Sequence, residues 1–178
     1  EFYNLKNNIY KNKIIIIILF VLVSFYFFFF SSLLIRLKIE FGEEMILILI
    51  ISCIFSDIGG YIVGKSVGGP KLTSISPNKT ISGAFGSIIF TIIGTSLFLI
   101  YLNNVEENKF ELKFSVSFCI WLVVMSILCQ LGDLIISYLK RRANIKDTGN
   151  ILPGHGGILD RVDGIIFAIP IGILIYFF

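Results

Sequence analysis

The residues best suited to chemistry lie in one polar stretch near the carboxyl end of the chain. Residues 137–163 combine several basic side chains with a glycine-flanked histidine, His155, and with the carboxylates of Asp160 and Asp163. Carboxylates are typical ligands of hard metal ions, whereas Lys and Arg bind phosphate oxygens. Further carboxylates lie upstream within apolar runs, at Asp57 and Asp133. A charge beside lipid is costly unless it is paired, hydrated or bound to an ion, so these acids are predicted to be functional.

The composition of the chain predicts an integral membrane protein. Of its 178 residues 56% are hydrophobic, 18 are phenylalanines, and the mean hydropathy is +0.89. A soluble domain of this size could not bury so much apolar surface. The net charge of only +3 is spread over loops, so we expect no nucleic-acid partner. The three cysteines lie in apolar runs without metal-ligand spacing, and we interpret them as core residues.

The apolar runs predict an all-α polytopic fold. A helix needs roughly 20 apolar residues to cross the ~30 Å hydrocarbon core of a membrane. Five segments meet this requirement, near residues 14–35, 45–64, 81–102, 114–139 and 157–178. We divide the chain into residues 1–44, which hold the tail, the first span and a short external loop, and a catalytic membrane domain over residues 45–178.

Loop charges predict how these spans are oriented. The amino-terminal tail, the second loop and the fourth loop carry net charges of +2, +3 and +3, whereas the first and third loops each carry −1. Cytoplasmic loops are enriched in Lys and Arg. The amino terminus is therefore predicted to be cytoplasmic and the carboxyl terminus external.

This topology brings acids from three helices to a similar depth. Asp57 and Asp133 would lie about 12 and about 10 Å inside the cytoplasmic ends of their helices, at a rise of 1.5 Å per residue. Asp160 and Asp163 begin the last helix on the same side, and their i, i+3 spacing turns both carboxylates to one face. Gathered carboxylates repel one another, and Mg²⁺ is the natural ion to neutralise them. The basic residues nearby suit a phosphorylated substrate: Lys79, Lys140, Arg141, Lys146 and Arg161.

Other features of the sequence are typical of structural roles. The glycines at positions 59, 60, 64, 68 and 69 favour close helix packing or turns over phosphate binding. Thr80 is predicted to cap a helix that begins at residue 81. His155 taken alone would be an ordinary loop histidine.

Taken together, these residues resemble a known enzyme family. The stretch from Ser137 to Asp163 is similar to the signature of the phosphatidate cytidylyltransferases, also called CDP-diacylglycerol synthases. The matching positions include Lys140-Arg141, Lys146-Asp147, Pro153-x-His155-Gly156-Gly157 and Asp160-Arg161-Val162-Asp163. Ser56-Asp57, the block from Ile75 to Thr80, and Gly132-Asp133-Leu134 resemble further family motifs. The resemblance covers about residues 45–178.

The resemblance implies that CTP and phosphatidate react at the cytoplasmic face of a bacterial inner membrane to give CDP-diacylglycerol and pyrophosphate. It implies Mg²⁺ held by Asp133 and Asp160, with Asp163 and Asp57 in support, and a monovalent cation such as K⁺ sharing the site. Lys146 and Arg161 are expected to act with these acids in catalysis by holding phosphates. Substrate contacts are expected from Ser76, Lys79, Lys140, Arg141, His155, Gly156 and Gly157. A homodimer is compatible with this assignment.

Two departures and two alternatives accompany the resemblance. Family members usually carry more amino-terminal spans, so the chain is expected to be a fragment or a reduced form. Ile81-Ser82 stands where they often have Trp-Glu. A CTP-dependent polyprenol or phytol kinase would share some of this architecture but would transfer the γ-phosphoryl group. A transporter or an inactive scaffold is the non-catalytic alternative.

Overall fold

The computed structural model describes residues 13–105, 115–145, 147–149 and 157–177. Within these ranges the chain folds into five helices and no strand, which confirms the predicted all-α fold. The helices are α2 (Lys13–Phe41), α3 (Glu43–Val67), α4 (Ile81–Val105), α5 (Val116–Arg142) and α6 (Leu159–Phe177). His155, Gly156 and Lys146, which the sequence marked as site residues, lie outside the described ranges.

Four of the described helices, α2 to α5, are long and apolar enough to cross a membrane, and the protein is a multi-pass membrane protein. The fifth predicted span corresponds to α6, whose 19 residues begin with Asp160, Arg161 and Asp163. These charges leave an apolar segment shorter than the ~20 residues that a lipid-exposed crossing needs. Packing against other helices compensates, because Ala168, Ile169 and Ile173 of α6 are buried in the core.

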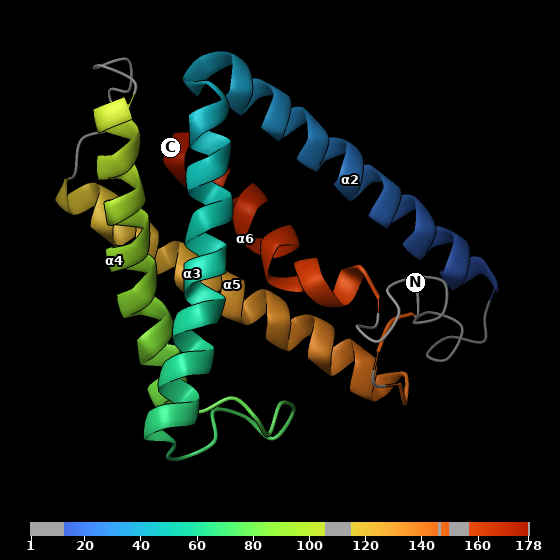
Figure 1. The fold of residues 1–178 in the computed structure, drawn as a ribbon. Coiled ribbons are helices and arrows are strands. Elements are labelled where there is room, and N and C mark those ends of the chain that lie inside the picture. Colours follow the sequence, from blue (N-terminus) through green and yellow to red (C-terminus); the bar gives the residue numbers. More distant parts are fainter. Residues whose placement is uncertain (1–12, 106–114, 146, 150–156, 178) are drawn as a thin grey trace.

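The first predicted loop is shorter than expected. Helix α2 runs on to Phe41, and an Arg36–Glu40 ion pair at i, i+4 supports its last turns. Gly42 then breaks the helix with φ 83°, a left-handed conformation that glycine adopts without strain. Helix α3 begins at the next residue, so the two helices meet in a tight corner (Figure 1).

Helices α3 and α4 run side by side and make the closest helix pair of the fold (Figure 1). Small residues permit this approach. A Cβ atom at Gly86 would lie 2.4 Å from Cβ of Val63 and 2.8 Å from the backbone oxygen of Gly59. A Cβ at Gly83 would lie 2.8 Å from the backbone oxygen of Gly60. A Cβ at Gly59 of α3 would in turn lie 2.5 Å from the backbone oxygen of Gly86, so the packing role predicted for this glycine is confirmed.

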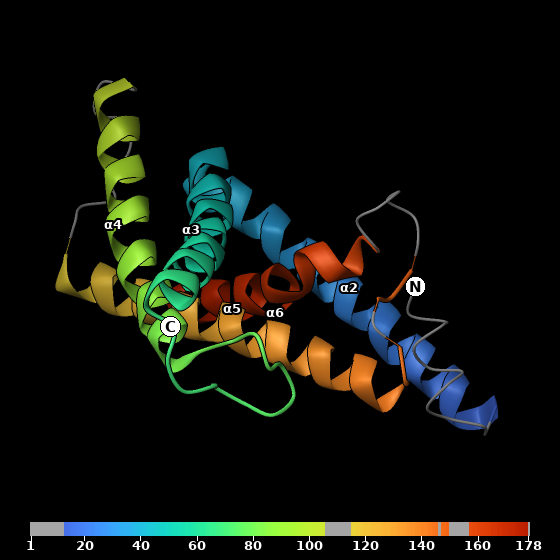
Figure 2. The same cartoon turned by 60° about the horizontal axis from the view of Figure 1, so that its bottom comes forward.

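Helices α5 and α6 form a second pair, which crosses the α3–α4 pair obliquely in both views (Figures 1 and 2). The indole Nε1 of Trp121 donates a 3.0 Å hydrogen bond to the backbone oxygen of Gly172, deep in this pair. A core of buried Leu, Ile, Met and Cys side chains joins α3, α5, α6 and the last turns of α2. The polar residues of interest lie where the two helix pairs cross.

Candidate functional site

A cavity with several polar groups in a mainly apolar lining opens between α3, α4, α5 and the loop of residues 68–80. Its volume is about 330 Å³, within the usual range for small-molecule sites. Polar groups from every one of these segments line it, including Asp57, Ser76, Lys79, Ser87, Gln130 and Asp133. We call this cavity the Lys79 pocket.

The loop of residues 68–80 holds Lys79 over the pocket. The backbone N–H of Leu72 donates to the Lys79 oxygen at 2.8 Å, and the Lys79 N–H donates to the Ser76 oxygen at 3.1 Å. Thr80 then caps α4, because its Oγ1 accepts a 3.1 Å hydrogen bond from the Gly83 N–H. The predicted cap is confirmed, and it fixes Lys79 directly before the helix.

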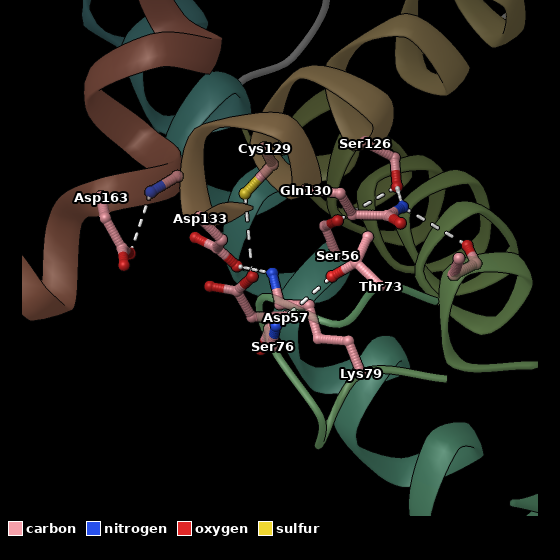
Figure 3. A network of polar contacts seen from close by, with 12 residues as sticks. Ser56, Asp57, Thr73, Ser76, Lys79, Ser126, Cys129, Gln130, Asp133 and Asp163 are labelled. Carbon is pink, nitrogen blue, oxygen red and sulfur yellow. Dashed lines mark hydrogen bonds and ion pairs between the residues drawn. The ribbon is translucent and has the colours of Figure 1, made fainter. Parts of the chain in front are cut away.

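Lys79 forms an ion pair with Asp133 of α5, with Nζ 2.8 Å from Oδ2. Both side chains are largely shielded, at 28% and 20% exposure. Figure 3 shows the ammonium group beside the Asp57 carboxylate of α3 as well. Asp57 Oδ1 also accepts a weak 3.7 Å hydrogen bond from the thiol of Cys129. The pocket therefore joins acids from two helices to one lysine.

A third acid, Asp163 of α6, lies on the other side of Asp133 (Figure 3). Asp133 lies close enough to Asp57 and to Asp163 for the charges of these acids to interact. The sequence predicted that acids from three helices would meet, and the structure brings these three together. We call Asp57, Asp133 and Asp163 the acid cluster.

Glycines explain how α6 comes so close to Asp133. A Cβ at Gly132 would lie 2.9 Å from the backbone oxygen of Asp163, and a Cβ at Gly164 would lie 2.8 Å from Oδ1 of Asp133. Each glycine is the chain neighbour of a cluster acid. Because these glycines have no side chains, α5 and α6 cross closely, and the carboxylates of Asp133 and Asp163 lie near each other.

Asp160 belongs to a separate group of contacts. Its Oδ1 pairs with Lys140 Nζ at 2.8 Å, and the two side chains are only 9% and 14% exposed. Its Oδ2 accepts hydrogen bonds from the N–H of Thr148 at 2.9 Å, from the Thr148 hydroxyl at 3.0 Å and from the N–H of Gly157 at 3.0 Å. Asp160 therefore ties the end of α5 and the following turn to the start of α6.

The remaining predicted residues that the structure describes lie in different environments. Arg141 and Arg161 are exposed, whereas Ser76 lines the Lys79 pocket. Asp133 and Asp160, which were predicted to share an ion, have different lysines as partners. Whether they come together on an ion stays a prediction.

The donor chemistry of the acid cluster fits Mg²⁺, although its present geometry does not complete a metal site. When all three carboxylates are ionised, their negative charge exceeds what the Lys79 ammonium offsets, and a divalent cation would reduce this excess. Oxygen ligands are those that Mg²⁺ prefers. Among the described residues, however, no group of three or more His, Cys, Asp or Glu is arranged to hold a metal ion.

Sequence reasoning missed two polar residues of these sites. Gln130 lies one turn before Asp133 on the pocket side of α5, and that spacing could have identified it. Thr148 gives two hydrogen bonds to Asp160, but its position depends on the turn after α5. In that turn Asn144 adopts φ 55°, a conformation for which the sequence gives no strong signal.

Comparisons with known proteins show the family of the chain. Residues 3–178 match the model of the cytidylyltransferase family. The chain is 38% identical over 140 residues to the phosphatidate cytidylyltransferase of Helicobacter pylori strain J99, covering 78% of this chain and 49% of that protein. It is 42% identical over 116 residues to the Bacillus subtilis strain 168 enzyme of the same name, covering 65% and 40% of the two chains.

A third relative, the phosphatidate cytidylyltransferase of Rickettsia typhi, is 40% identical over 150 residues, covering 82% of this chain and 65% of that protein. The chain spans about half the length of the curated relatives it matches. Because the family model covers nearly every residue from the amino to the carboxyl end, the protein belongs to the cytidylyltransferase family.

Proposed function

We propose that the protein transfers a cytidylyl group from CTP to phosphatidate, forming CDP-diacylglycerol and releasing pyrophosphate. The observation that carries this proposal is the Lys79–Asp133 ion pair, which lines a pocket between apolar helices beside two further carboxylates. Relatives named phosphatidate cytidylyltransferase support the choice of substrates. An acid cluster flanked by lysines suits a reaction between two phosphates.

The reaction requires stabilisation of negative charge more than it requires a general base. A phosphate monoester has a second pKa of about 6, so the phosphatidate oxygen arrives largely deprotonated. That oxygen bonds to the α-phosphorus of CTP, and the bond from the α-phosphorus to the oxygen bridging to the β-phosphate breaks. Pyrophosphate leaves with the electron pair of that bond. The site must overcome repulsion between two anions, which is an electrostatic task.

Lysines supply part of this stabilisation. Lys79 Nζ reaches the pocket from a loop fixed by backbone hydrogen bonds, so its ammonium can contact phosphate oxygens without a large rearrangement. Lys140 is held by Asp160 at the neighbouring end of α5 and α6. Arg141 and Arg161, both exposed nearby, extend the positive rim toward incoming phosphates.

Mg²⁺ would be held by the acid cluster, and a monovalent cation such as K⁺ would share that region. When bound, the divalent ion would neutralise phosphate charge and stabilise the leaving pyrophosphate. Asp133 is central in the cluster, and Asp57 and Asp163 flank it. Asp160 would join them only by leaving its contact with Lys140.

The orientation of the helices is part of the proposal. Positive loops put residues 68–80 and the end of α5 in the cytoplasm, where CTP is available, and put the corner between α2 and α3 outside. Phosphatidate would enter from the bilayer, because its acyl chains are costly to move into water. The proposed location is a bacterial inner membrane, with a homodimer compatible with this arrangement.

Cysteine labelling tests this orientation at the two ends of α3. Glu43 and Lys71 are exposed side chains near the start and beyond the end of this helix. We expect Lys71→Cys to react with an impermeant maleimide only in inverted vesicles, and Glu43→Cys only in intact cells. The unsubstituted chain, with its native cysteines, gives the background. The opposite pattern, or both sites labelled from one side, would reject the orientation.

Substitution of Asp133 tests the proposed reaction. The purified chain with labelled CTP, phosphatidate and Mg²⁺ is expected to form CDP-lipid, and Asp133→Asn is expected to lower the rate by at least about 100-fold. Glu40→Gln, which removes an exposed carboxylate paired with Arg36, is the matched control and should keep its rate. Phospho-lipid as the product would indicate a kinase, and near-normal turnover by Asp133→Asn would refute the role of Asp133.

The Lys140–Asp160 pair allows structural and catalytic roles of Asp160 to be separated. Removing one partner of a fully buried ion pair costs about 3–5 kcal/mol, because the other charge is left uncompensated, and a smaller cost is expected for this partly buried pair. We therefore expect Asp160→Asn and Lys140→Gln each to lower stability in mixed-micelle unfolding, and the double variant to regain most of it. CDP-lipid formation should stay lost in the double variant. Recovery of activity together with stability would show that Asp160 is only a structural partner.

A further inference from the structure

The Lys79 pocket contains an amide group that no step of the proposed reaction uses. Gln130 lies on α5 one turn deeper than Asp133, and both side chains face the cavity. An amide within an apolar helix is costly unless its hydrogen-bonding groups have partners. Gln130 therefore has to be explained either by contacts within the protein or by a ligand.

Within the ranges that the structure describes, the protein provides partners only for the nitrogen of this amide. Nε2 of Gln130 donates to the backbone oxygen of Ala84 on α4 at 3.4 Å and to Oγ of Ser126 at 3.3 Å (Figure 3). A backbone oxygen can only accept a hydrogen bond, so the nitrogen must be the amide atom that faces Ala84. The two contacts employ both amide hydrogens and fix which way the group points.

The amide oxygen is left to face the pocket. Among the residues that the structure describes, no donor to Oε1 of Gln130 is present, and this oxygen is not among the fully buried unpartnered atoms. Below it, Ser56 and Ser126 close the floor with a hydrogen bond of 3.0 Å between their hydroxyl groups. The pocket thus offers a fixed acceptor at its inner end and an ammonium group, that of Lys79, at its mouth.

We propose that Gln130 determines nucleotide specificity by accepting a hydrogen bond from the exocyclic amino group of cytosine. This inference rests on the proposed function and assigns the base of the nucleotide to the inner end of the Lys79 pocket. Cytosine carries an amino donor where uracil carries an oxygen acceptor. A uracil in the same place would set its oxygen against the fixed oxygen of Gln130, leaving both without a hydrogen.

The anchoring of the amide makes this discrimination effective. A freely rotating glutamine could turn its nitrogen toward uracil and accept either base. Turning Gln130 would break both bonds of Nε2 and leave the Ala84 oxygen opposite another acceptor. Sites built to hydrogen-bond a polar substrate group reject analogues that lack it strongly, because buried groups are then left unpaired. Ser126 acts here as a positioning residue.

Rates with CTP and UTP test the assignment in the purified chain with phosphatidate and Mg²⁺. We expect the wild type to prefer CTP over UTP in kcat/KM by at least about 100-fold. Gln130→Leu should bring this ratio close to one, chiefly through loss of activity with CTP. Asn103→Leu is the matched control, since it removes a half-buried amide on α4 far from the pocket and should keep the ratio.

Ser126→Ala provides a milder variant in case Gln130→Leu fails to fold. It removes one anchor of Nε2 and should lower the CTP preference by about tenfold while CTP is still used. An unchanged preference in either folded variant would overturn the role of Gln130. Equilibrium binding of CTP and UTP separates this inference from the proposed reaction. If no CDP-lipid forms, CTP-selective binding that Gln130→Leu abolishes still supports the inference, and unselective or absent binding overturns it.

Discussion

Repulsion among carboxylates within apolar helices is the constraint on which the site depends. Two like charges 4 Å apart repel by roughly 4 kcal/mol at the effective dielectric constant typical of proteins. The acid cluster gathers three such groups from α3, α5 and α6, and Lys79 forms its ion pair with one of them, Asp133. This repulsion costs free energy in the protein alone, and additional positive charge at the site would offset it. A bound cation would therefore both relieve the repulsion among these carboxylates and compensate the negative charge of the substrates.

Close packing of the helices brings the acids and Lys79 together. Gly59, Gly83 and Gly86 let α3 and α4 come together, and Gly132 with Gly164 lets α6 lie against α5. The loop between the first pair carries Lys79 to the junction of the two pairs. Asp160 fastens the start of α6 to the end of α5 and so fixes the depth at which Asp163 meets Asp133. Stability and site geometry thus rest on the same small residues and ion pairs.

Much of this could be predicted from the sequence, because membrane helices follow length and charge rules. The helices, the Thr80 cap and the meeting of acids from three spans followed from apolar runs, a capping residue and the shared depth of Asp57, Asp133 and Asp163. The pairing of Asp133 with Lys79 and of Asp160 with Lys140 could not be predicted, because it depends on loop conformation. The loop that carries Lys79 to Asp133 is closed by a bridge between Lys71 and Thr80. The turn that brings Thr148 to Asp160 contains Asn144 in a left-handed conformation. Gln130 carries no charge, so neither the charge pattern nor the depth of the acids predicted its place beside the pocket.

The most direct test of the acid cluster is binding of Mn²⁺, a spectroscopic stand-in for Mg²⁺, measured by electron paramagnetic resonance on the purified chain without substrates. If the cluster holds a divalent cation, the wild type should quench the signal of free Mn²⁺ through one tight site, and Asp133→Asn should weaken that site by at least about tenfold. Glu40→Gln should bind as the wild type does. Equal Mn²⁺ affinity in Asp133→Asn and the wild type would contradict the account.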